Sequence, residues 1–175
     1  MLIETEETYN PNVRNFYLNI KAFDERKAEY ADCVTADASE LAQSILKIKG
    51  VEKVLILPDM LFIEKNDNAD FSFLAPQIMA EIVDFDFAKF QNFDFSKQDI
   101  SAQINALVEA KIRPFLKADG GDIEVVGFEN GTVNVRLQGR CKGCVHAKQT
   151  MKNIVEALLK KYIGGVLSVR EQEDG

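Results

Sequence analysis

A β-hairpin centred on Asn130-Gly131 is the feature that most restricts what this chain can fold into. An Asn-Gly pair suits the tight two-residue turn in which both central residues need a positive φ. After the turn, apolar and polar residues alternate, and the apolar members are Val133, Val135 and Leu137. A period of two is typical of a strand that buries one face. Residues 123–128 supply a partner strand, so the sequence predicts an antiparallel pair.

Two helices and one further strand are predicted around this hairpin. Before it, apolar residues recur at spacings of three and four over residues 104–116, and Gly120-Gly121 follows as a helix stop. After it, a second amphipathic helix carries the inward set Met151, Ile154, Val155, Leu158, Leu159 and Tyr162. Gly164-Gly165 breaks that helix, and residues 166–170 can add a strand. The predicted order is α-β-β-α(-β).

The first half of the chain predicts a second small α+β domain with the order β-β-α-β-β-α. Strands are expected over residues 2–7, 13–20, 51–57 and 60–63. The first helix is expected after Asp37 as its N-cap, with Glu40 at the third helical position of a capping box. A second helix is expected from about residue 70. The fold class is therefore α+β, with two small domains.

Charge and aromatic content suggest where the two domains divide. Residues 1–99 contain 10 Lys and Arg against 19 Asp and Glu, whereas residues 100–175 contain 11 against 9. We assign 1–84 to the first domain, 85–97 to a Phe/Asp-rich linker and 98–175 to the second domain. Five of the 12 phenylalanines lie in this connection, unlike the Gly, Ser or Pro of ordinary linkers. The favoured interpretation is that the preceding helix continues and the rings pack on the domains; the alternative is an exposed aromatic strip that binds a partner.

Composition argues against several classes of function. The formal net charge of −7 and the isoelectric point near 4.9 disfavour nucleic acid or an anionic membrane as the main partner. No apolar run approaches the roughly 20 residues of a membrane span. Three cysteines and an acidic start without a signal or Arg-rich transit peptide predict a reducing, cytoplasmic location. The mitochondrial matrix is the alternative, if a transit peptide was removed before residue 1.

The chemistry of the chain is expected at Cys141 and Cys144, between the end of a strand and the start of a helix. A C-x-x-C turn lets two sulfurs converge on one ion or cluster. The free amides and dipole of a helix N-terminus favour thiolates, and Arg140, Lys142 and Lys148 add positive charge. A lone pair of this kind is also compatible with a dithiol redox site or half of a zinc site.

The number of ligands restricts these alternatives. A zinc or cubane site takes about four protein ligands, and this chain offers two adjacent thiols, while Cys33 lies in the other domain without a partner thiol. Two copies related by a two-fold axis would complete the set. Only 31 residues follow Cys144 and none is proline, which weakens a thioredoxin-like enzyme. We see no constellation for turnover of an organic substrate, so a non-enzymatic function is expected.

The second domain resembles the C-terminal domain of the NifU-like (Nfu-type) iron–sulfur proteins. The resemblance lies in residues 119–125, residues 133–139 and the Cys141/Cys144 pair with its helix. The first domain is similar to the N-terminal domain of the same family over residues 8–12, 39–51 and 62–65, a less specific match. The chain departs from the family pattern at Tyr9, at Lys142 and over residues 145–147.

The resemblance implies an assembly scaffold or carrier that holds a [4Fe–4S] cluster between two chains and delivers it to apo-proteins. Cys141 and Cys144 would be the cluster and metal ligands, and the partners would be a second copy, the upstream assembly machinery and client apo-proteins. A thiol–disulfide oxidoreductase and a zinc-stapled dimerisation module remain the alternatives. His146, the one histidine, is expected as a polar residue of the first helical turn, and Cys33 as a small hydrophobe or an idle thiol.

Overall fold

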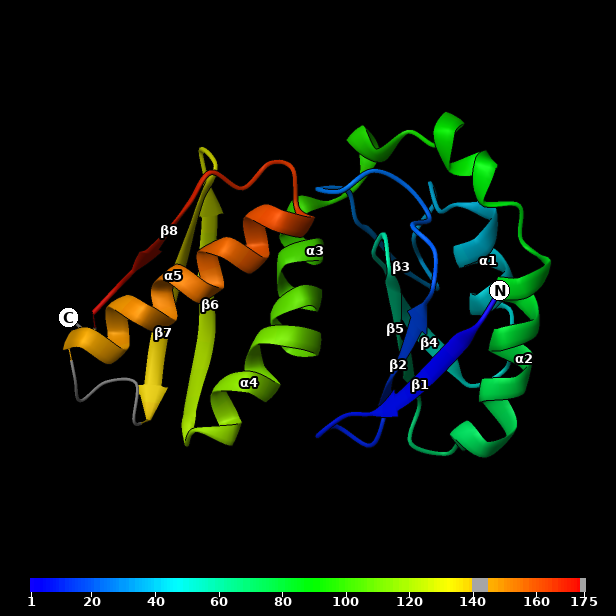
Figure 1. The fold of residues 1–175 in the computed structure, drawn as a ribbon, viewed down its shortest axis with the longest axis horizontal. Coiled ribbons are helices and arrows are strands. Elements are labelled where there is room, and N and C mark those ends of the chain that lie inside the picture. Colours follow the sequence, from blue (N-terminus) through cyan, green and yellow to red (C-terminus); the bar gives the residue numbers. More distant parts are fainter. Residues whose placement is uncertain (140–144, 174–175) are drawn as a thin grey trace. The chain divides into compact units, whose positions relative to one another are not determined.

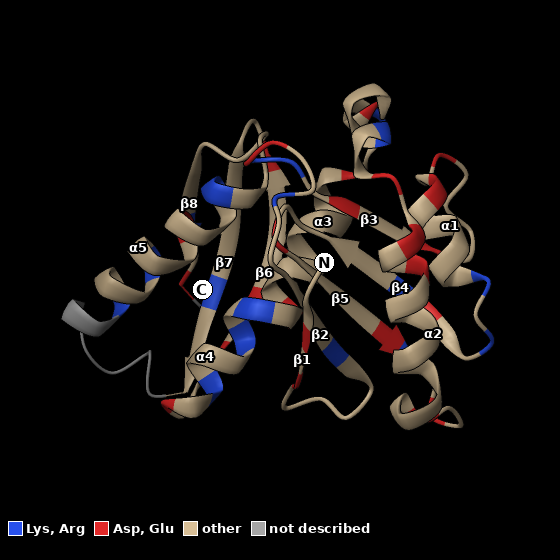
Figure 2. Cartoon of the chain, turned by 45° about the vertical axis from the view of Figure 1, so that its right-hand side comes forward, with Lys and Arg blue, Asp and Glu red and all other residues tan. Residues whose placement is uncertain are grey.

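A computed structural model describes residues 1–139 and 145–173 of the chain, which divides into two units, Met1–Asp99 and Ile100–Gly175 (Figure 1). Each unit combines helices with its own sheet, which confirms the α+β class with two small domains. No helix in the described parts of the chain is long and apolar enough to cross a membrane. Asp and Glu are frequent on unit 1, whereas Lys and Arg mark two helices of unit 2, α4 (Arg113–Ala118) and α5 (Val145–Tyr162) (Figure 2).

Unit 1, in which every residue is described, contains an antiparallel sheet with the strand order β1-β2-β5-β4-β3. Its elements are β1 (Ile3–Glu7), β2 (Val13–Leu18), β3 (Glu29–Asp32), α1 (Glu40–Leu46), β4 (Val51–Ile56), β5 (Met60–Lys65) and α2 (Phe71–Asp84). The helices bury Ile45 and Ile78 against Phe16, Ile56 and Ile63 of the sheet. The predicted order lacked β3, because its alternation is hidden by a glutamate at a buried position.

The predicted start of the first helix was wrong, and Glu29 takes part in the cap that is observed. The N-cap is Ser39, and Asp37 is not part of the cap. The Ser39 hydroxyl accepts from the amide of Ala42 at 3.2 Å, while the Ser39 amide donates to the buried carboxylate of Glu29 at 2.6 Å. The second half of the capping arrangement therefore comes from β3 instead of from the helix itself.

The Phe/Asp-rich segment belongs to unit 1. The helix does not continue through it: α2 ends at Asp84, and two short 3₁₀ helices follow, η1 (Phe87–Asn92) and η2 (Phe95–Lys97). Asp86 and Asp94 cap them by accepting from backbone amides at 3.0 and 3.1 Å. Phe90 is buried, and the rings partly buried against the same core are Phe23, Phe85, Phe87, Phe93 and Phe95. The alternation of Phe and Asp thus has a local cause: the rings pack inward and the carboxylates cap the turns.

Unit 2 begins with a helix that changes its pitch. The predicted single helix is α3 (Ile100–Leu107), a π-helical stretch η3 (Val108–Ile112) and α4 (Arg113–Ala118) in succession. Pro114 lies at the start of α4. It has no amide hydrogen, and its ring crowds the carbonyl four residues earlier, so the wider π turn accommodates it.

The rest of unit 2 follows the sequence prediction. Within its described part, β6 (Gly121–Glu129), β7 (Thr132–Gly139) and β8 (Ser168–Glu171) form a sheet in this order, and α5 (Val145–Tyr162) connects β7 to β8. Asn130 and Gly131 take φ values of 50° and 80°, which confirms the predicted hairpin turn. The predicted third strand is β8, and it runs parallel to β7. Helices α4 and α5 pack on β6 and β8, respectively.

Candidate metal centre

The two sulfur ligands proposed from the sequence, Cys141 and Cys144, lie outside the described residues. The structure therefore defines the site through the two elements that flank it. Strand β7 ends at Gly139 and helix α5 begins at Val145, so the pair is carried between a strand and a helix, as predicted.

The end of β7 is fixed by a close approach of backbone to backbone. Gly139 has a φ of +68° and pairs with Gly121 across the hairpin. A Cβ at position 139 would lie 2.5 Å from the carbonyl oxygen of Gly120 and 3.2 Å from the Cα of Gly121. Gly120 and Gly121, which connect α4 to β6, are therefore in contact with the glycine that ends β7. The Gly120-Gly121 pair does more than stop a helix, because it sets where the chain leaves the sheet towards Cys141.

An ion-pair network holds the same end of the sheet. The Arg113 guanidinium, at the start of α4, lies 3.0 Å from the carboxylate of Asp122 on β6 and 2.9 Å from that of Glu109. Asp122 pairs in register with Gln138, one residue before Gly139. Three consecutive elements of the fold are thus joined beside the point where the site begins.

Helix α5 carries the chain away from the site. Val155, Leu159 and Tyr162 are buried, so the second half of the helix is anchored along one face. That turn contains no acidic residue. The positive end of the helix dipole therefore meets no competing carboxylate on its own helix, which favours anions and thiolates there. His146 lies in this turn, as predicted.

The sequence interpretation of Lys148 was that it adds positive charge to the site. The structure shows which carboxylates lie beside that charge. Its ammonium group lies 3.5 Å from the carboxylate of Glu171 and 3.7 Å from that of Glu173. Its charge is therefore partly offset by one acidic residue at the end of β8 and one just after it. The sequence could not indicate this contact, because it depends on β8 lying parallel to β7.

Cys33 is an exposed free thiol in the turn after β3, so it is an accessible thiol and not a buried hydrophobe. Among residues 1–139 and 148–173, no group of three or more His, Cys, Asp or Glu side chains is arranged to hold a metal ion. The metal-binding hypothesis thus continues to rest on the pair at positions 141 and 144.

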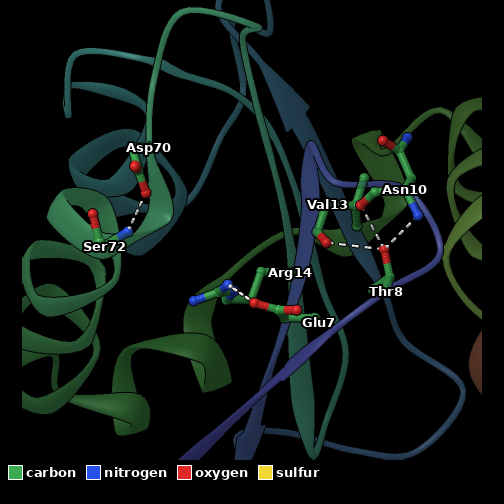
Figure 3. A network of polar contacts seen from close by, with 7 residues as sticks. All are labelled: Glu7, Thr8, Asn10, Val13, Arg14, Asp70 and Ser72. Carbon is green, nitrogen blue, oxygen red and sulfur yellow. Dashed lines mark hydrogen bonds and ion pairs between the residues drawn. The ribbon is translucent and has the colours of Figure 1, made fainter.

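The family-like segment at residues 8–12 forms a turn between β1 and β2 (Figure 3). The Thr8 hydroxyl lies 2.8 Å from the carbonyl oxygen of Asn10 and 2.9 Å from that of Val13, and it accepts from the Asn10 amide at 3.1 Å. Beside this turn, Arg14 forms an ion pair with Glu7 at 2.9 Å and stacks on the ring of Phe71. Local hydrogen bonding therefore accounts for the residue pattern of this segment.

Each of the two units matches a known family model. The family model "Scaffold protein Nfu/NifU N terminal" matches residues 3–88, and "NifU-like domain" matches residues 104–170. NifU-like protein 4 of Arabidopsis thaliana, a mitochondrial protein, is 34% identical over 100% of this chain and 67% of its own length. The human mitochondrial NFU1 iron-sulfur cluster scaffold homolog is 31% identical over 99% of this chain and 73% of its own length.

Among solved structures, the solution structure of a NifU-like protein from Saccharomyces cerevisiae is 26% identical, with a TM-score of 0.40 over 46% of this chain and 74% of that one. The two curated relatives are named as mitochondrial, so they give the cytoplasmic expectation no support. The matches to family models and relatives extend over both units. The chain therefore belongs to the Nfu-type family of NifU-like proteins.

Proposed function

We propose that this chain is an iron–sulfur cluster scaffold or carrier. It binds a [4Fe–4S] cluster through Cys141 and Cys144 of two chains and transfers the cluster to apo-proteins. The observation that carries the proposal is the match of both family models to a chain whose C-x-x-C pair lies between a strand and a helix N-terminus. The scaffold function named for the human relative supports the same conclusion.

The stoichiometry follows from the number of ligands. Each chain contributes two thiolates, and a cubane cluster takes about four protein ligands. Two chains related by a two-fold axis satisfy that requirement without a ligand from unit 1. The cluster is cargo in this mechanism: the protein holds it at an interface between chains and releases it without changing an organic substrate. We accordingly propose a function without enzymatic turnover.

The partners follow from the same mechanism. A carrier needs an upstream assembly system that loads it and client apo-proteins that accept the cluster, and neither is a nucleic acid or a membrane. The mitochondrial names of the relatives favour the mitochondrial matrix as the compartment.

Anaerobic reconstitution with ferrous iron and sulfide, followed by iron and sulfide analysis with size measurement, tests the proposal. We expect about four iron atoms and four sulfides per two chains, and a dimer that returns to monomer when the cluster is removed. A colourless protein that retains zinc would support the zinc-stapled module, and reduction of disulfides without bound iron would support the oxidoreductase. A complete cluster in a monomer would contradict the shared site.

Single substitutions assign the ligands. Cys141→Ser and Cys144→Ser should each abolish stable cluster binding, since each removes two sulfurs from the dimer. Cys33→Ser is the matched control, because it removes an exposed thiol of the other unit and should leave cluster content unchanged. Loss of the cluster in the Cys33 variant would show that the ligand assignment is wrong.

A further inference from the structure

The last strand brings negative charge towards the candidate metal centre. Strand β8 runs parallel to β7, with Ser168 opposite Thr132 and Glu171 opposite Val135. The amide of Gln172 continues this pairing by donating to the carbonyl of Val135 at 2.8 Å. The segment 171–173 therefore proceeds in the direction in which β7 leads to Gly139 and the cysteine pair.

Lys148 is where this acidic segment contacts the helix that follows the cysteines. Lys148 lies four residues after Cys144, and long side chains on a helix lean towards its N-terminus. Its ammonium group contacts the carboxylates of Glu171 and Glu173 at 3.5 and 3.7 Å. The side chains of Lys148 and Glu171 are 23% and 19% exposed, so this pair is only partly screened by water, whereas Glu173 is 84% exposed.

The charges in this group do not cancel. One ammonium faces two carboxylates, so the group carries a net charge of about −1 beside the N-terminal turn of α5. A cubane cluster bound by thiolates is anionic, as are the free thiolates themselves. The helix dipole attracts this cargo, and the acidic segment opposes that attraction.

We propose that Glu171 and Glu173 weaken the binding of the anionic cluster by the cysteine pair. They do so by their own negative charge and by forming ion pairs with the ammonium group of Lys148. This inference rests on the proposed function and adds a determinant of cluster release to it. A carrier has to release what it holds, and an acidic segment built into the fold supplies a constant repulsion that makes release easier.

The test compares the full-length Glu171→Gln/Glu173→Gln variant with the wild type, after anaerobic loading with iron and sulfide. Release to an iron chelator should be roughly two- to fivefold slower in the variant at low salt, and the difference should shrink as salt screens the charges. Lys148→Gln should release faster. Glu129→Gln is the matched control, because its exposed carboxylate lies at the hairpin turn, seven residues or roughly 23 Å along β7 from Gly139.

The sign of the effect separates this electrostatic role from a structural one. If the ion pairs only fasten α5 to β8, removing the carboxylates would loosen the site and speed release, as the Lys148 variant does. Faster or unchanged release in the glutamine variant would therefore overturn the proposal. Thermal unfolding of each variant checks that the fold is retained.

A second readout needs no cluster. In a Cys33→Ser background, alkylation of the apo-protein by iodoacetamide at one fixed pH reports on the thiolate character of the remaining cysteines. The glutamine variant should react roughly two- to fivefold faster and Lys148→Gln more slowly. Equal rates would overturn the proposal. If no variant and no wild-type protein takes up a cluster, the proposed function fails, while the alkylation rates still decide the role of the acidic segment.

Discussion

Replacing Gly139 by alanine should destabilise unit 2 strongly. The backbone φ of +68° is left-handed, which costs an alanine about 1–2 kcal/mol. The new Cβ would also lie 2.5 Å from the carbonyl oxygen of Gly120, where ordinary contacts begin at 3.4 Å. Overpacking of this kind costs about 1–3 kcal/mol. Together the two effects predict a loss of about 2–5 kcal/mol in the free energy of unfolding.

Gly127 provides the matched control on the neighbouring strand. A Cβ there would meet nothing within 4 Å, and its φ is not in the left-handed range. Gly127→Ala should therefore change stability by no more than about 1 kcal/mol, in the stabilising direction. Native-state hydrogen exchange on the peptides that cover β6 and β7 measures the two variants against the wild type, without interference from unit 1. Equal protection in both variants would refute the argument that Gly139 is fixed by its contact with Gly120.

Three further predictions concern unit 1. Burial raises the pKa of Glu29, so its contribution to stability is present below the ordinary carboxyl pKa and is lost as pH rises through the raised value. Glu29→Gln should remove this part of the pH dependence of urea unfolding midpoints; parallel profiles would contradict it. Ser39→Ala removes the N-cap of α1 and should cost about 1 kcal/mol by urea unfolding, whereas no loss would mean that the Glu29 contact alone caps the helix. Phe90→Ala should cost about 3–5 kcal/mol in thermal unfolding. The same change at Phe73, which is 75% exposed, should cost less than about 0.5 kcal/mol, and equal losses would refute the packing of the Phe-rich segment.

Local patterns predicted most of the elements, and tertiary contacts explain the exceptions. The Asn130-Gly131 turn and β8 could be found because turn residues and strand periodicity act over a few positions. Strand β3 could not, because a buried Glu29 that bonds to the Ser39 amide interrupts its apolar pattern. The π-helical stretch before Pro114 was also missed, since a change of pitch leaves apolar spacings of three and four unchanged.

At the candidate site, too, local features could be predicted from the sequence and long-range contacts could not. Cys141 and Cys144 could be proposed as ligands from their spacing, because only two residues separate them in the sequence. The partners of Lys148 are not readable, because Glu171 reaches it only after β8 has aligned beside β7. Sequence alone therefore predicted a pair of ligands but could not show that two carboxylates lie beside a nearby lysine.

The exposed thiol of Cys33 offers a route to a covalent dimer. In air, two such thiols can lose two electrons and two protons to oxygen and join two chains through a disulfide. That covalent dimer would persist in the presence of an iron chelator and separate on reduction. A cluster-linked dimer would respond in the opposite way, separating when iron is withdrawn. The exposed Cys33 would thus add, beside the proposed cluster-linked dimer, a second and chemically distinct route to the same apparent mass.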